Sequence, residues 1–127
     1  MAGMSTAGYA AVAAGEDWHY VGEAGEPAFE NSWGNLSGDT AMAFRIRESG
    51  VVDLQGAVTG GSPGVVFTLP AGYRPSQDTS VLAADTSGPN VVGIAVILQN
   101  GSVIPSGSLA EVHVYGSFFL DPPLTTP

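Results

Sequence analysis

Alternating apolar and polar residues in residues 50–76 give the clearest structural signal in the chain. Val52, Leu54 and Val58 alternate with Asp53, Gln55 and Ala57. A period of two predicts a half-buried β-strand. The glycine-rich residues 60–64 then favour a reversal, and residues 65–69 form a second apolar run. We therefore expect a β-hairpin over residues 51–69.

The hairpin is followed by a segment that cannot continue a sheet. Two prolines, which have no backbone N–H to donate, lie within residues 70–76. This segment predicts a rigid structural corner, formed by Pro70, Gly72, Tyr73, Arg74 and Pro75. Arg74 has the chemistry to hold a ligand carboxylate, but the carbonyl groups of the corner itself favour a structural role.

Further strands are predicted on both sides of this segment. Residues 18–21 and 81–84 fit short strands, and residues 41–47 place Phe44 and Ile46 opposite Arg45 and Arg47. Residues 91–99 are almost continuously apolar, which predicts a strand in the middle of a sheet with both faces covered. Residues 111–120 alternate again and predict the last strand.

Turn-forming residues separate these predicted strands. Asn100 and Gly101 predict a two-residue type I′ turn into a strand over residues 102–104. Seven or eight short strands with no long amphipathic helix predict an all-β fold, an antiparallel β-sandwich or jelly roll with a short N-terminal arm. We expect the arm in residues 1–15, the sandwich in residues 16–121 and a proline-rich tail in residues 122–127.

Composition narrows the classes of partner. The 127 residues include three arginines, no lysine and twelve acidic residues, which gives a formal net charge of −9. Such a charge disfavours nucleic acids and anionic membranes as partners. No run approaches the ~18 apolar residues that span a bilayer, so we expect no membrane insertion. The absence of cysteine excludes disulfides.

Residues 60–64 match the G-x-S-x-G pattern of a hydrolase nucleophile elbow. In that elbow the residue after the serine donates a backbone N–H to the oxyanion, and Pro63 has none. We therefore expect a loop and no enzymatic activity. The two histidines, His19 and His113, lie near carboxylates but lack metal-ligand spacing, so no cofactor or metal is predicted.

Aromatic residues near the start of the sandwich have two interpretations. Trp18, Tyr20, Phe29 and Trp33 can form a platform for sugars, or they can pack in the core or between subunits. We take Trp18, Tyr20 and Trp33 as candidate ligand or inter-subunit contacts.

Taken together, these motifs resemble the C-terminal head domains of bacteriophage tail-fibre and minor tail proteins. The resemblance covers about residues 18–120. It rests on the corner residues above and on Gly50, Val51, Asp53, Leu54, Gly56, Val58, Phe67, Leu69, Trp18, Gly22, Pro27, Phe29 and Trp33. At Asp53 the family pattern often has a hydrophobic or polar residue. Residues 91–98 and 112–120 match its closing strands. It implies a small, usually trimeric all-β sandwich outside a virion that is assembled in the host cytoplasm. No ligand-binding residue transfers, because the matching positions are scaffold.

The resemblance leaves three functions open. The first is a short minor tail or fibre protein whose arm contacts other virion proteins and whose outer loops contact the host envelope. A glycan of the host cell surface is one candidate receptor. The second is a trimeric capsid decoration protein with its arm laid across capsid subunits. The third is a carbohydrate-binding module. The sequence does not separate the tail from the capsid.

Overall fold

The computed structural model describes residues 16–48, 50–86, 91–106 and 110–120. In this part of the chain the regular structure consists of β-strands. The predicted arm, the proline-rich tail and the turn at residues 87–90 lie outside the described residues. The strands are β2 (His19–Tyr20), β3 (Gly34–Asn35), β4 (Ala43–Glu48), β5 (Val51–Thr59), β6 (Phe67–Thr68), β7 (Thr79–Asp85), β8 (Val91–Ile97), β9 (Ser102–Pro105) and β10 (Glu111–Phe119).

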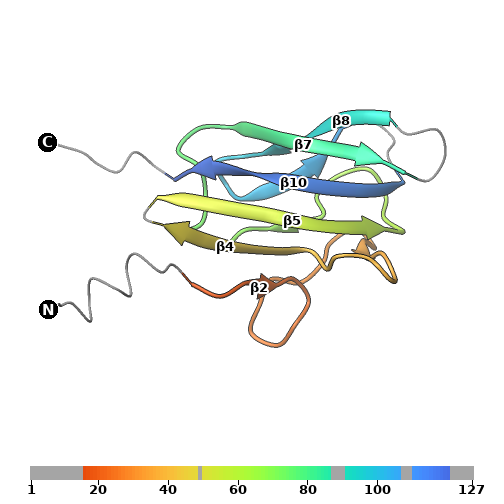
Figure 1. Ribbon diagram of the computed structural model, residues 1–127, viewed down its shortest axis with the longest axis horizontal. Coiled ribbons are helices and arrows are strands. Elements are labelled where there is room, and N and C mark those ends of the chain that lie inside the picture. The colour runs from red at the N-terminus through yellow and green to blue at the C-terminus, as the bar shows by residue number, and fades with distance from the viewer. Residues whose placement is uncertain (1–15, 49, 87–90, 107–109, 121–127) are drawn as a thin grey trace, which may run out of the picture.

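All of these strands pair antiparallel in one curled sheet. The order is β2-β4-β5-β10-β7-β8-β9-β6, with β3 paired to β5. Figure 1 shows β4, β5, β10 and β7 side by side, with the chain after β8 passing behind them. The rings of Phe44 on β4 and Phe67 on β6 stack at 5.8 Å between centroids, although these strands lie near opposite ends of the order. The sheet therefore closes over itself and gives the predicted sandwich-like, all-β fold.

The core lies between the two layers and follows the alternation of the sequence. On β5, Val52, Leu54 and Val58 are buried as predicted. On β10, Val112, Val114 and Phe118 face the same core. Because neighbouring residues of a strand point to opposite faces, the same strands present a second, outer face.

The hairpin predicted over residues 51–69 does not form. Strand β5 pairs with β4 and β10 along its two edges, and β6 pairs with β9. Residues 65–69 therefore find no free edge at β5 and cross to the other layer. Strand β6 is also shorter than expected, with only Phe67 and Thr68.

The prediction for residues 91–99 is half right. Strand β8 lies between β7 and β9, away from the edges of the sheet. However, Val92 and Ile94 are 73% and 44% exposed, whereas Ala95 and Ile97 are buried. Only one face of β8 is covered, because the core fills one side of the curled sheet. A continuous apolar run does not by itself say that both faces are buried.

Residues 98–102 form the predicted β8–β9 hairpin with a different turn. The N–H of Gly101 donates to Leu98 O at 2.8 Å, and the N–H of Leu98 donates to Ser102 O at 2.9 Å. Gly101 has a φ of 94°, while Asn100 is not among the positive-φ residues. A type I′ turn needs positive φ at both positions, so this prediction was wrong. The geometry fits a type I turn followed by a glycine bulge.

Candidate functional site

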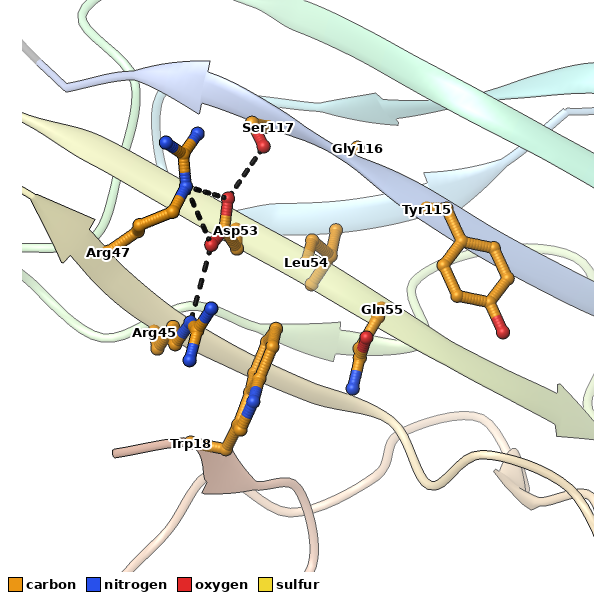
Figure 2. Close-up of a pocket in the computed structure, with 9 residues that line it drawn as sticks. All are labelled: Trp18, Arg45, Arg47, Asp53, Leu54, Gln55, Tyr115, Gly116 and Ser117. Carbon is orange, nitrogen blue, oxygen red and sulfur yellow. Dashed lines mark hydrogen bonds and ion pairs between the residues drawn. The ribbon is translucent and has the colours of Figure 1, made fainter. Parts of the chain in front are cut away.

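The outer face of strands β4, β5 and β10 carries an open hollow of about 360 Å³ (Figure 2). Strand register assembles it: Arg45 is paired with Asp53, and Asp53 with Ser117. Gln55 and Tyr115 form the next cross-strand pair. The lining residues, which we call the outer hollow, are Trp18, Arg45, Arg47, Asp53, Leu54, Gln55, Tyr115, Gly116 and Ser117.

Asp53 is the centre of the charged contacts in the outer hollow. Its carboxylate accepts hydrogen bonds from Arg45 Nε at 3.3 Å, from Arg47 Nε at 3.1 Å and from Ser117 Oγ at 2.6 Å. Burial raises the pKa of Asp53, but the bonds from Ser117, Arg47 and Arg45 outweigh it and hold this pKa below its usual value. Asp53 is therefore ionised at neutral pH. We call Arg45, Arg47, Asp53 and Ser117 the Asp53 cluster.

Trp18 forms one wall of the hollow. The guanidinium carbon of Arg45 lies 4.3 Å from the centroid of the Trp18 ring, in a cation–π contact. Figure 2 shows the indole of Trp18 next to Arg45, at the side of the hollow opposite Ser117. This contact and the bond to Asp53 hold Arg45 from two sides.

A second polar cluster lies beside strand β2. His19 Nδ1 lies 2.9 Å from Glu26 Oε2, and His19 Nε2 lies 3.3 Å from Glu16 Oε2. The hydroxyl of Tyr73 donates to Glu16 Oε1 at 2.9 Å. The His19 ring also stacks on Phe44 at 5.1 Å, against the core. We call Glu16, His19, Glu26 and Tyr73 the His19 cluster.

The ionisation of the His19 cluster follows from these contacts. The hydrogen bond to Glu26, with a smaller contribution from Glu16, raises the pKa of His19 above 6.5. Burial, and then the bond to Glu16, raise the pKa of Tyr73 to about 12. Burial also raises the pKa of Glu16, but bonds from the Ile46 backbone, Tyr73 and His19 outweigh it and lower that pKa.

The structural corner packs against the core and the β8–β9 hairpin. Arg74 Nε donates to Leu69 O at 2.8 Å, a bond that spans residues 70–73 of the corner. The tip of the hairpin lies against this bond, because a Cβ on Gly101 would come within 2.7 Å of Arg74 Nε. Pro75 is buried. The guanidinium of Arg74 thus binds a carbonyl of the chain itself.

The structure separates the three candidate aromatic residues. Trp18 lines the outer hollow, and Tyr20 is 39% exposed on β2 outside it. Trp33 is only 5% exposed, donates from Nε1 to Ser62 O and covers Gly61 so closely that a Cβ there would meet the indole at 2.0 Å. Trp33 is therefore a core residue and offers no surface to a ligand, which corrects its place among the candidate contacts.

An exposed apolar strip continues the outer face beyond the hollow. Tyr115 on β10 is paired with Leu82 on β7, and Leu82 with Ile94 on β8. Each is more than 40% exposed, and Val92 lies in the next row. Tyr115, Leu82, Ile94 and Val92 form what we call the apolar strip. Exposed apolar residues on adjoining strands are a common mark of an interaction surface.

Other candidate chemistry finds little support in the described residues. They contain no group of three His, Asp or Glu side chains placed to hold a metal ion. Ser62, the serine of the elbow-like pattern, lies in a loop between β5 and β6, and its carbonyl accepts the bond from Trp33. No helix in this part of the chain is long and apolar enough to cross a membrane.

Sequence reasoning missed the Asp53 cluster as a site. The alternation already placed Arg45 and Arg47 on one face of their strand and Asp53 on the outer face of the next. What it lacked was the pairing of β4 and β10 on either side of β5, which brings Ser117 to Asp53 from 64 residues away.

Comparisons with known proteins give one structural likeness. No family model and no curated protein matches the chain. The crystal structure of the receptor binding protein (gp15) of Listeria phage PSA aligns with a TM-score of 0.68 and 12% identity, over 91% of this chain and 71% of that one. The chain thus has the fold of a phage receptor binding protein.

Proposed function

We propose that this chain is a bacteriophage virion protein, a short minor tail or fibre protein that lies at the particle surface and contributes to host attachment. The observation that carries the proposal is the shared fold with the receptor binding protein of a Listeria phage, over 91% of the chain. The motifs of residues 50–76 and the two aromatic lead-in residues Trp18 and Trp33 resemble the same class of domain.

The proposed role is binding and not catalysis. The only nucleophile-like motif, around Ser62, has a proline where an oxyanion donor is needed, and its loop is covered by Trp33. The polar clusters of the described residues are held by ion pairs with their own neighbours. Fold likeness alone does not exclude an activity, so the proposal rests on the chemistry of these residues.

Self-association is part of the proposal, as the homotrimer that the resemblance to phage head domains implies. The apolar strip supports it, because it offers aliphatic and aromatic surface without a charged residue on a chain of net charge −9. Copies that meet there avoid bringing acidic side chains together. Light scattering of the purified chain at micromolar concentration tests this: a trimer that Leu82→Ser with Ile94→Ser converts to monomer supports it, and a wild-type monomer contradicts it.

The location on the particle is tested by antibody labelling of purified virions. We expect label confined to the tail end. Label spread over the head would favour the alternative, a trimeric capsid decoration protein, and would contradict the tail assignment. Virions assembled without this chain serve as the control for non-specific label. Absence from the particle would favour a carbohydrate-binding module instead.

A further inference from the structure

The outer hollow collects most of the positive charge of an acidic chain. Two of the three arginines, Arg45 and Arg47, line it together with one acid, Asp53. Their charges sum to about +1, in a protein of net charge −9. Solubility alone would not require two of the three arginines to lie together on one surface. The hollow is therefore a place in the described chain where an anionic group can contact two guanidinium groups.

The two arginines keep binding capacity after they pair with Asp53. Both contact the carboxylate through Nε, and in the described residues their terminal nitrogens, Nη1 and Nη2, form no hydrogen bond within the chain. Figure 2 shows those nitrogens of Arg47 directed away from Asp53. A planar guanidinium can donate from Nη to a second acceptor while Nε stays engaged. Asp53 thus orients the arginines without using up their donors.

The walls of the hollow add the features that a sugar needs. Trp18 supplies an aromatic surface, which packs on the C–H face of a sugar ring. Gln55 and Ser117 supply polar groups, and the hydroxyl of Tyr115 points away from the Asp53 cluster (Figure 2). All except Trp18 lie on paired strands, so the chain presents these groups with little loss of conformational freedom on binding.

From this arrangement we propose that the outer hollow binds a saccharide that carries a carboxylate or phosphate group. The terminal nitrogens of Arg45 and Arg47 donate to the anionic group, and Trp18 packs against the sugar ring on the side of Gln55. The proposal rests on the proposed attachment function, which it deepens by naming a site and a ligand class.

Titration calorimetry of the full chain with three matched sugars tests the ligand class. The probes are glucuronic acid, glucose 6-phosphate and glucose. We expect at least one anionic sugar to bind about tenfold more tightly than glucose, which corresponds to ~1.4 kcal/mol. Whichever of glucuronic acid and glucose 6-phosphate binds more tightly shows whether the hollow prefers a carboxylate or a phosphate. Equal binding of all three, or no binding of either anionic sugar at ~10 mM, overturns the proposal.

Variants of the hollow test the site. Arg47→Gln and Trp18→Ala should each weaken binding of the anionic sugar about tenfold or more. Arg47→Lys keeps the charge but loses the planar set of guanidinium donors, so its affinity should lie between those of the wild type and Arg47→Gln. Tyr20→Ala, an exposed aromatic outside the hollow, is the matched control and should bind like the wild type. Near-UV circular dichroism establishes that each variant is folded. Unchanged binding by Arg47→Gln overturns the site.

The experiment separates this inference from the function on which it rests. Virions that carry Arg47→Gln should adsorb to host cells more slowly than wild-type virions. Normal adsorption with label at the tail would contradict the hollow as the attachment site and leave the tail assignment intact. Label over the head would contradict the proposed function, whatever the sugar titrations show.

Discussion

Strand β4 has a polar cluster on each side, and the two clusters differ in how their charge is fixed. Arg45 points outward to Asp53, whereas its neighbour Phe44 points inward and stacks on His19. In the Asp53 cluster an acid lies between two permanent cations. In the His19 cluster the only cation is an imidazole, whose charge depends on pH. The contribution of Asp53 is therefore lost as pH falls, whereas that of the His19 imidazole is lost as pH rises.

The comparison also separates a binding surface from a structural contact. The Asp53 cluster opens into a hollow and leaves guanidinium donors free. The His19 cluster uses both ring nitrogens within the chain, and Tyr73 ties it to the structural corner. Openness, and not the number of charged groups, marks the first cluster as the candidate site.

The largest expected effect comes from the core that supports both clusters. Phe67 is fully buried, and its ring stacks on Phe44 at the core face of β4. Phe67→Ala should lower the free energy of unfolding by ~3–5 kcal/mol, because it removes packing and leaves a cavity. Urea denaturation measures the change. A loss below ~1 kcal/mol would show that the layers do not depend on this stack.

Asp53→Asn should have the next largest effect, a loss of about 1–2 kcal/mol at neutral pH, because three charge-assisted hydrogen bonds are weakened. The folded-state pKa of Asp53 is lowered, so its stabilisation is present above the unfolded-state pKa and is lost as pH falls through the folded value. The variant should therefore lose less stability than the wild type on acidification. Equal acid profiles would contradict the assigned role.

His19→Gln should show the opposite pH dependence, with a smaller effect. The folded-state pKa of His19 is raised, so its stabilisation is present below pH 6.5 and is lost as pH rises through the folded value. We expect about 0.5–1 kcal/mol, since the partners Glu16 and Glu26 are a quarter to a third exposed. Denaturation midpoints at about pH 5.5 and about pH 8.5 measure it. A variant destabilised equally at both values would assign His19 a packing role alone.

Arg47→Gln should have the smallest effect on stability, below ~0.5 kcal/mol, because this side chain is 44% exposed and its ion pair is screened by solvent. Its effect on sugar binding should be much larger. Thermal denaturation and titration of the same preparation make the comparison. A loss of stability comparable to that of Asp53→Asn would indicate that Arg47 holds the fold and is not reserved for a ligand.

The sequence alone determined the fold class and the facing of most strands. Alternation is a local property: it sorted Val52 from Asp53, Phe44 from Arg45, and the buried from the outer residues of β10. The resemblance of residues 50–76 to phage head domains also pointed to the fold shared with a phage receptor binding protein. These inferences needed no knowledge of which strand lies beside which.

Only the tertiary structure decided the pairing, and with it the candidate site. The edges of β5 are taken by β4 and β10, which sends residues 65–69 to β9 instead of into a hairpin. That same pairing brings Arg45 and Ser117 to Asp53. The curl of the sheet leaves one face of β8 exposed. Register and curvature depend on contacts between residues far apart in the chain, and a pattern of neighbouring residues does not encode them.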